Sequence, residues 1–176
     1  MINQSLTARL RKIKLVILDV DGVLTDGRLF YGANGEQLKV FHSLDGHGLK
    51  MLAGSGVVLA IISGRTSRAL AKRARDLGIK HLMMGVENKA VAFQKLCQKT
   101  KFAPLEAASI GDDIVDLPIL LHCGFSACVP NAPADVKKRV DYVTKQSGGQ
   151  GAVREFCEVI MRAQGSYRAA LQHYLA

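Results

Sequence analysis

Tryptophan is absent from this sequence, and proline and cysteine are scarce, with 4 residues of each. The cysteines form no C-x-x-C pair and have no histidine at the spacing of a zinc site, so we expect reduced, partly buried thiols. The longest apolar run, residues 57–62, falls far short of the ~20 residues that a membrane helix needs. Residues 1–14 lack the apolar stretch and the cleavage site of a signal peptide. These absences predict a cytoplasmic protein that does not enter a membrane.

Aromatic residues make up only 6% of the chain, which leaves few platforms for stacking nucleic-acid bases. The 24 Lys and Arg exceed the 15 Asp and Glu, and the net charge of +9 favours anionic partners such as phosphorylated small molecules. The basic residues form short clusters rather than the long like-charge runs of a nucleic-acid-binding tail. We therefore expect no nucleic-acid partner; a protein of that class would bind oligonucleotides in a salt-dependent way.

With 176 residues, of which 48% are hydrophobic, the chain is long enough to bury a core of its own. It has no internal repeat, low-complexity tract or linker. We expect a single domain over residues 1–176.

Short apolar runs alternate with helical segments along the chain. The expected strands are residues 15–18, 57–62, 81–84, 107–110, 125–129 and 142–143. Helices are expected between them, over 90–100, over 114–121, and around a face formed by Leu70, Ala74 and Leu77 that Gly78 stops. Continuous apolar strands separated by helices indicate a parallel sheet covered on both faces, so we expect a doubly wound, Rossmann-like α/β fold.

One segment after the first strand breaks this alternation. Residues 28–31 and 37–41 flank Asn34-Gly35, which is a strong β-hairpin signal. We expect a small hairpin insertion that forms a flap over about residues 26–45. At the other end, a tail over about 164–176 has helical spacing, and it would pack on the core or on a neighbouring chain.

Two carboxylates, Asp19 and Asp21, end the first expected strand in the run D-V-D-G-V-L-T. Ligands of doubly wound sheets bind beyond the carboxyl ends of the strands. Carboxylates at this spacing can serve as nucleophile and general acid/base, or as oxygen ligands of Mg²⁺. A polar turn is the alternative, since Asp and Gly also favour turns.

Ser63 follows the second core strand in I-I-S-G-R-T, and Lys89 lies near the start of a helix in G-V-E-N-K-A. A hydroxyl and free backbone N–H groups at such a junction can hold a phosphate, and Arg65 adds an anion donor. Lys89 opposes the helix dipole, which is a mild indication of function. The alternatives are a helix cap for Ser63 and a solvated surface position for Lys89.

Asp112, Asp113 and Asp116 lie close together in S-I-G-D-D-I-V-D-L-P. Acids at this density repel one another unless a cation neutralises them. Asp113 and Asp116 also suit the start of a helix. We expect Asp112 to bind a metal while the other two cap and support the site. The four motifs, namely the first acid pair, Ser63, Lys89 and the later acids, each follow a different strand. They can therefore converge on one crevice.

The order of these motifs resembles the haloacid dehalogenase superfamily: strand-D-V-D-G-V first, then S-G-R, Lys89 and G-D-D-I-V-D, over residues 14–117. More narrowly, the chain resembles the phosphatases that act on 3-deoxy-D-manno-octulosonate 8-phosphate in lipopolysaccharide synthesis. The features that carry this resemblance are D-G-V-L-T-D-G, the hairpin with G-E, F-x-x-x-D-G-x-G at 41–48, and S-G-G-Q-G-A-V-R-E.

The resemblance implies roles for five residues. Asp19 would be the nucleophile that forms an aspartyl-phosphate, and Asp21 would protonate the leaving sugar oxygen and then activate water. Mg²⁺ would bind the Asp19 carboxylate, the Asp21 backbone carbonyl and Asp112. Ser63 and Lys89 would hold the phosphoryl oxygens. An anionic carboxylate that attacks an anionic phosphate needs such nearby positive charge.

The resemblance also implies a capless enzyme that assembles as a homotetramer with its hairpins packed together. The small-molecule sugar phosphate would then contact Asp21, His42, Ser43, Asp45, Gly46, Arg65, Arg73, Lys89 and Arg154. The glycine-rich segment 148–154 would reach a neighbour's site and place Arg154 against the sugar carboxylate. For Arg73 and Arg154, a solvated helix face is the alternative.

Leu44 departs from the pattern, because some relatives carry Arg before the D-G of the 41–48 motif. A related nine-carbon sugar acid phosphate is therefore an alternative substrate. His47 is either a pocket residue or a residue of a helix start. A different class, a phospho-accepting signalling domain, also has acids, a hydroxyl and a lysine, but such domains pair adjacent acids on the first strand and lack the hairpin.

Overall fold

The computed structural model describes residues 4–175 of the chain. Its main sheet has six parallel strands in the order β5-β4-β1-β6-β7-β8. These strands are β1 (Leu15–Leu18), β4 (Val58–Ile62), β5 (His81–Met83), β6 (Ala107–Gly111), β7 (Phe125–Cys128) and β8 (Tyr142–Val143). The six expected core strands are confirmed, with ends that move by no more than one residue.

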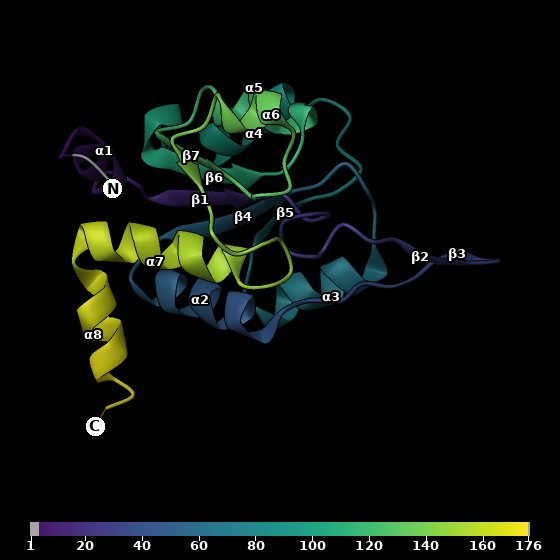
Figure 1. Cartoon of the computed structure of the whole chain (residues 1–176), viewed down its shortest axis with the longest axis horizontal. Coiled ribbons are helices and arrows are strands. Elements are labelled where there is room, and N and C mark those ends of the chain that lie inside the picture. Colours follow the sequence, from purple (N-terminus) through teal and green to yellow (C-terminus); the bar gives the residue numbers. More distant parts are fainter. Residues whose placement is uncertain (1–3, 176) are drawn as a thin grey trace.

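Helices cover both faces of this sheet (Figure 1). One layer contains α2 (Ser43–Gly54), α3 (Arg68–Asp76) and α7 (Ala152–Gln164), and the other contains α4 (Lys89–Thr100) and α5 (Leu117–Leu120). The remaining helices are α1 (Gln4–Leu10), α6 (Ala134–Lys137) and α8 (Ser166–Gln172). The predicted doubly wound α/β fold is confirmed.

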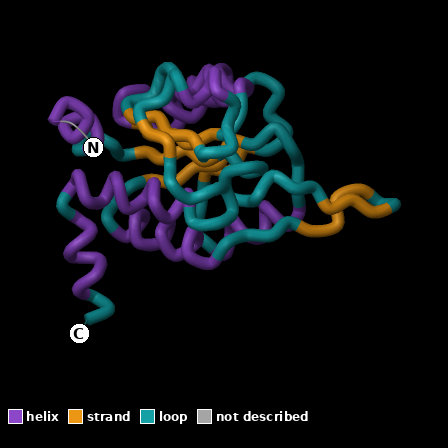
Figure 2. Tube along the Cα trace, viewed as in Figure 1, coloured by secondary structure: helices purple, strands orange, loops and turns teal. Residues whose placement is uncertain are grey.

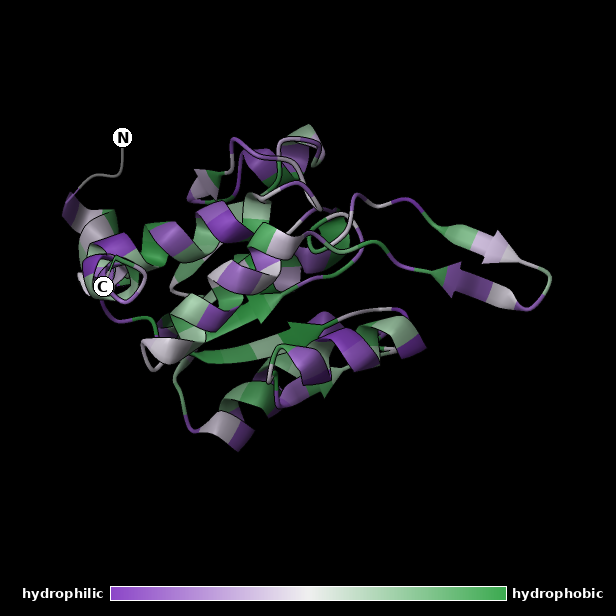
Figure 3. Cartoon of the chain, turned by 90° about the horizontal axis from the view of Figure 1, so that it is seen from below, coloured by the Kyte–Doolittle hydropathy of each residue, from purple (hydrophilic) through white to green (hydrophobic). Residues whose placement is uncertain are grey.

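The central strand β1 is buried along its whole length because helices pack on both of its sides. Val16 and Leu18 belong to the core beneath the α2–α7 layer, whereas Leu15 and Ile17 belong to the core beneath α4. Figure 3 shows the result as apolar strands between helices of mixed polarity. This two-sided burial explains why the strands read as continuous apolar runs rather than as alternating ones.

The strand order places the ends of β1 and β6 at a switch point of the topology. From β1 the chain moves outward to β4 and β5, and it then crosses back to β6, β7 and β8 on the other side of β1. At such a point the connections leave in opposite directions and open a crevice beyond the strand ends. The residues that follow β1 and β6 therefore face the same crevice.

The predicted hairpin is present as β2 (Phe30–Gly32) and β3 (Gly35–Leu38), which project beyond the main sheet (Figure 2). Its turn differs from the expectation. Ala33 and Asn34 are the central turn residues, and Gly35, with φ +95°, already pairs with Gly32 on the opposite strand. Because Asn34 keeps a negative φ, the turn is not the mirror-image type in which Asn-Gly would be central; the glycine follows the turn instead.

Two helix predictions also need correction. The flap ends before residue 43, because Ser43 to Gly54 form α2, which includes the first turn that was assigned to the flap. The helix expected over 114–121 is a 3₁₀ turn over Ile114–Asp116 followed by the short α5. Pro118 lacks the N–H that would bond to the carbonyl of Ile114, so the two turns do not merge into one helix.

The C-terminal tail packs on its own chain. The guanidinium of Arg162 in α7 lies 3.8 Å from the ring centroid of Tyr167 in α8. Tyr174 packs edge to face on His47, with ring centroids 5.3 Å apart. His47 itself is a residue of α2. The four cysteines are free and at least partly buried, as predicted. Over residues 4–175, no helix has the length and apolarity that crossing a membrane requires.

Candidate active site

The carboxyl ends of β1 and β6 bring two acidic segments together. Asp19 directly follows β1, and its N–H donates to the carbonyl of Ile110 in β6 at 3.1 Å. Asp112 directly follows β6. The parallel pairing of these two strands therefore fixes the two carboxylates as neighbours.

Asp19, Asp112 and Asp116 form a cluster in which one oxygen of each lies within 4.8 Å of the others. The backbone fixes the carboxylate of Asp116, since the N–H groups of Asp112 and Asp113 donate to its Oδ2 at 3.1 and 3.2 Å. Asp113 caps the following turn, with its Oδ1 accepting from the N–H of Ile114 at 2.7 Å. Asp113 therefore caps the turn beside the cluster, whereas Asp116 belongs to the cluster; the supporting role of Asp113 stays a prediction.

Burial and the neighbouring acids raise the pKa values of Asp19 and Asp112. Burial, and then the charge of Asp116, raises the pKa of Asp19 to about 6. Burial, and then the charges of Asp19 and Asp116, raises the pKa of Asp112 to about 7. Crowded, half-desolvated carboxylate oxygens are the donor set that a hard divalent cation such as Mg²⁺ prefers. The residues at this site therefore fit a magnesium ion.

A glycine allows the loop after β1 to approach Asp112 closely. Gly22 has φ +92°, and a Cβ at this position would lie 2.2 Å from Asp112 Oδ2. The glycine-rich segment near α7 packs on the same loop: the N–H of Gly149 donates to the carbonyl of Val23 at 3.0 Å. This segment therefore packs on the site loop of its own chain, and the expectation that it reaches a neighbour's site stays a prediction.

Lys89 lies in the cluster rather than on the surface. It is the first residue of α4, its side chain is 6% exposed, and its Nζ lies 2.6 Å from Asp19 Oδ1 and 2.5 Å from Asp116 Oδ1. Burial acts to lower the pKa of Lys89, but the charges of Asp19 and Asp116 raise it, so the amine stays charged. A cation at a helix N-terminus is unfavourable by itself, and the two acids explain it here.

Ser63 follows β4 and is buried. Two backbone hydrogen bonds fix its position. Its N–H donates to the carbonyl of Met83, and its carbonyl accepts from the N–H of Val86. Its Oγ accepts from the N–H of Arg65 at 3.3 Å. Ser63 therefore caps the local turn by accepting a hydrogen bond. Its hydroxyl proton stays free to donate to a ligand.

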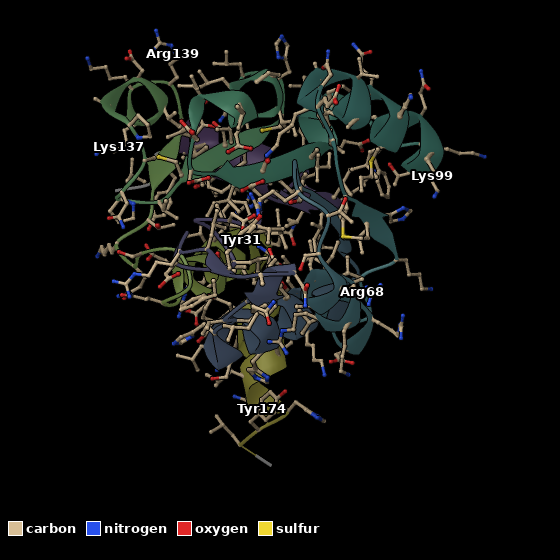
Figure 4. All side chains as sticks on the ribbon, turned by 90° about the vertical axis from the view of Figure 1, so that its right-hand side faces the viewer. Tyr31, Arg68, Lys99, Lys137, Arg139 and Tyr174 are labelled. Atoms are coloured by element: carbon tan, nitrogen blue, oxygen red, sulfur yellow. The ribbon has the colours of Figure 1, made fainter. Side chains whose placement is uncertain are left out.

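Asp21 faces the hairpin and not the acid cluster. Its carboxylate forms an ion pair with Lys39 at the base of the hairpin, and its Oδ2 lies 3.7 Å from Arg65 Nε. The guanidinium of Arg65 also donates to the hydroxyl of Tyr31 in β2. Figure 4 looks along the hairpin and shows Tyr31 near the middle of this face, whereas Arg68, Lys99, Lys137 and Arg139 lie at the rim.

Sequence reasoning missed Lys39, the ion-pair partner of Asp21, and Tyr31, whose hydroxyl accepts from Arg65. Lys39 was detectable as the single charged residue in the expected second hairpin strand, 37–41. Its partner Asp21 lies 18 positions away, beyond any local pattern.

The expected pocket residues near α2 connect three helices. Asp45 Oδ1 accepts from the N–H of Arg154 at 2.8 Å, so this carboxylate caps the start of α7. Gly46 leaves room for Arg73, since a Cβ there would lie 2.2 Å from Arg73 Nη2. His42 occupies the N-cap position of α2 and Ser43 is its first residue. Within residues 4–175, no hydrogen bond or ion pair joins these residues to the acid cluster.

Arg154 is not a solvated helix-face residue. Its Nε lies 2.7 Å from Glu158 Oε1, and its side chain is 21% exposed. Together with Leu44 it lines an open cavity of about 570 Å³ along α7. The guanidinium of Arg73 lies 5.9 Å from the ring centroid of Phe41, so it too is partly covered.

Comparison with known proteins identifies the family of the chain. The family described as haloacid dehalogenase-like hydrolase matches residues 82–156. The chain is 43% identical over 164 residues to the 3-deoxy-D-manno-octulosonate 8-phosphate phosphatase of Escherichia coli K12, covering 93% of this chain and 87% of that protein. It is 48% identical over 157 residues to the Haemophilus influenzae phosphatase of the same description, covering 89% and 87%.

Solved structures of such phosphatases share the fold. The Moraxella catarrhalis phosphatase in complex with magnesium, phosphate and KDO superposes with a TM-score of 0.93 at 40% identity, covering 96% of this chain and 97% of that one. The cobalt-bound Haemophilus influenzae phosphatase gives a TM-score of 0.87 at 48% identity, covering 89% and 92%. The chain therefore belongs to the haloacid dehalogenase superfamily and is one of its phosphatases.

Proposed function

We propose that this phosphatase removes phosphate from 3-deoxy-D-manno-octulosonate 8-phosphate, or from a sugar acid phosphate very like it, in lipopolysaccharide precursor synthesis. The observation that carries the proposal is the cluster of Asp19, Asp112 and Asp116 around Lys89 at the β1–β6 switch point. The relatives described above, named for this substrate, match nearly the whole chain.

Asp19 is the nucleophile in the mechanism that we propose. Its Oδ1 is held by Lys89, which leaves the other carboxylate oxygen to attack phosphorus and form an aspartyl-phosphate. A Mg²⁺ ion held by Asp19, Asp112 and the Asp21 carbonyl would neutralise charge on the phosphoryl group. Lys89 adds a fixed positive charge beside the reacting atoms, and the Ser63 hydroxyl donates to a phosphoryl oxygen.

Asp21 is the general acid/base. In the first half-reaction its carboxyl donates a proton to the sugar oxygen as the bond from that oxygen to phosphorus breaks. In the second, its carboxylate accepts a proton from the water that attacks the aspartyl-phosphate. Asp19 is regenerated and inorganic phosphate is released, so the two halves balance.

The sugar end of the substrate would lie toward the basic residues around the crevice. We assign Arg65, Arg73 and Arg154 to the sugar acid, and His42, Ser43, Asp45 and Gly46 to the wall formed by the start of α2. Leu44 lines the same cavity as Arg154 and is 54% exposed. It offers no charge to a substrate carboxylate, which keeps a nine-carbon sugar acid phosphate as the alternative substrate.

We also propose that the chain acts as a single domain in a homotetramer. The hairpin exposes a row of large apolar side chains that a neighbour could cover, namely Leu29, Phe30, Tyr31, Leu38 and Val40. Its free cysteines suit a reducing compartment such as the cytoplasm. Sedimentation at several concentrations tests the assembly, and a monomer at all of them would contradict it.

The test of the activity is phosphate release from a panel of sugar phosphates, with Mg²⁺ and with EDTA. We expect metal-dependent turnover that is selective for 3-deoxy-D-manno-octulosonate 8-phosphate. Asp19→Asn should abolish it, whereas Asp135→Asn, at an exposed acid on α6, should not. Turnover of the nine-carbon acid phosphate alone would change the assigned substrate to that compound. If folded, metal-loaded protein released no phosphate from any of these compounds, the proposed function would be refuted. A long-lived phosphoprotein without release would favour a signalling domain.

A further inference from the structure

Lys39 at the base of the hairpin is a buried cation between two carboxylates. Its side chain is 3% exposed, and its Nζ pairs with Asp21 Oδ1 on one side and lies 3.0 Å from Glu36 Oε2 on the other. Lysine is almost never buried to this degree unless it is paired. The two acids explain why this one tolerates burial.

Glu36 connects this pair to the main body of the chain. The hydroxyl of Ser67 donates to Glu36 Oε1 at 2.5 Å, and the same Ser67 oxygen accepts from the N–H of Leu70 as the N-cap of α3. A continuous series of contacts therefore runs from the start of α3 through Glu36 and Lys39 to Asp21. Both strands of the hairpin are therefore tied to the main body of the chain, β3 through Glu36 and Ser67 and β2 through Tyr31 and Arg65.

Asp21 has little else to fix its side chain. Its carboxylate is 20% exposed, and its other cationic neighbour, Arg65, is 3.7 Å away and 37% exposed. A group that transfers a proton must be held at one geometry relative to the leaving oxygen. In an open site, a close and desolvated partner is what can hold it, and Lys39 is such a partner.

We propose that Lys39 is a positioning residue that fixes the carboxyl group of Asp21 for proton transfer to the leaving oxygen. This inference rests on the proposed phosphatase mechanism and goes beyond it by giving the hairpin a role within its own chain. Lys39 acts through Asp21 and does not contact the phosphoryl group. The competing explanation is that Lys39 only staples the hairpin to α3.

The two explanations differ in their dependence on the leaving group. The kcat/KM value reports steps through the first bond cleavage, and 4-nitrophenolate leaves without needing a proton, whereas a sugar alkoxide needs one. We expect Lys39→Met to lower kcat/KM for 3-deoxy-D-manno-octulosonate 8-phosphate by about 100-fold, the low end of general-acid effects. For 4-nitrophenyl phosphate we expect a loss of less than about threefold.

Two further variants separate positioning from stapling. Glu36→Gln weakens the hairpin's anchor but leaves the Lys39–Asp21 pair, so kcat/KM for both substrates should change by less than about threefold. In an Asp21→Asn background, Lys39→Met should have almost no further effect, because its only route to the chemistry is gone. Lys39→Arg should recover most of the lost activity on the sugar phosphate.

Each result bears on the proposal in a definite way. Equal losses on both substrates, a loss in Glu36→Gln as large as in Lys39→Met, or additivity with Asp21→Asn would overturn it in favour of a staple. If Lys39→Met does not fold, the double variant Lys39→Met/Glu36→Gln replaces it. This double variant carries no unpaired Glu36 carboxylate, and its activity is compared with that of Glu36→Gln alone. Inactive wild-type protein with Mg²⁺ would instead refute the phosphatase mechanism itself, which is a different observation.

Discussion

At the scale of single residues, the site is a balance of buried charges. Three carboxylates crowd one lysine at the ends of β1 and β6, and burial, followed by the charges of neighbouring acids, raises the pKa values of Asp19 and Asp112 despite that lysine. In the mechanism that we propose, Lys89 orients the attacking carboxylate, and a bound cation would complete the neutralisation. Removing either positive charge should therefore affect both catalysis and folding.

Lys89→Met tests this balance. The variant leaves Asp19 and Asp116 without their buried partner, so we expect kcat to fall by ~10²–10³-fold and the free energy of unfolding to fall by ~3–5 kcal/mol. Lys99→Met, at an exposed position in the last turn of the same helix, should leave both unchanged. Steady-state kinetics and denaturant unfolding measure the two effects. A Lys89 variant with unchanged kcat would exclude the residue from the mechanism.

Gly22→Ala tests the close approach of the site loop to Asp112. Gly22 and Gly56 have nearly the same positive φ, +92° and +94°, but only at Gly22 would a Cβ meet a neighbour. Both alanine variants should lose a similar free energy of unfolding, about 1 kcal/mol, from backbone strain. Only Gly22→Ala should also displace Asp112, so the Mg²⁺ concentration for half-maximal activity should rise at least about tenfold, or roughly 1.4 kcal/mol of binding. Equal Mg²⁺ dependence in the two variants would contradict this account.

At the scale of elements, α2 is the helix whose start sequence reasoning missed, because a helix start was considered only at His47, whereas α2 begins at Ser43. Its first two turns contain Gly46 and Gly48, which weaken the local helix signal. The structure shows why they are there: side chains at these positions would collide with Arg73 of α3 and with Arg154 of α7. The cause is tertiary, so no pattern within residues 41–54 reveals it. The core strands, in contrast, were predictable because a strand that is buried on both faces consists of consecutive apolar residues.

Asp45 joins α2 to α7, and its variants should separate capping from charge. Its Oδ1 accepts from the N–H of Arg154, while burial raises its pKa, so the folded protein does not favour the charged form. Asp45→Ala removes the acceptor and should lower the free energy of unfolding by about 1–2 kcal/mol. Asp45→Asn keeps an acceptor and should cost less than half as much. Chemical denaturation measures both; an equal loss in the two variants would mean that the charge matters.

At the scale of the whole molecule, the strand order determines where the candidate active site lies. Strands and acids could be read from the sequence, and so could their convergence on one sheet edge. The hairpin's part in the site could not, because Lys39 meets Asp21 only after the hairpin folds back on the β1 loop. The tail likewise joined its own α7 through Arg162 and Tyr167, a contact that helical spacing alone does not specify.

The buried acids also make the stability of the metal-free protein depend on pH. The pKa values of about 6 for Asp19 and about 7 for Asp112 lie above their common unfolded value of 3.8. The folded state therefore binds more protons, and stability is lost as pH rises through these values. Mg²⁺ relieves the same repulsion, so we expect it to raise Tm more at pH 8 than at pH 5.5.

Comparing each pH with and without Mg²⁺ cancels the groups that lie away from the site. Asp135→Asn should keep the difference between the two pH values, and Asp112→Asn should reduce it. Differential scanning fluorimetry is sufficient for this comparison. An equal Mg²⁺ effect at both pH values would show that the cluster is not the site of the ion.

The most direct test of the central claim is to trap the phosphorylated enzyme. Protein with Mg²⁺ is mixed with 3-deoxy-D-manno-octulosonate 8-phosphate labelled in the phosphate, quenched in acid within the first turnover, and digested for peptide mapping. We predict label on Asp19, absent in Asp19→Asn and in EDTA, that disappears as labelled phosphate is released. Rapid release of phosphate with no label on the protein at any time, or label on a residue outside the β1 end, would contradict the account.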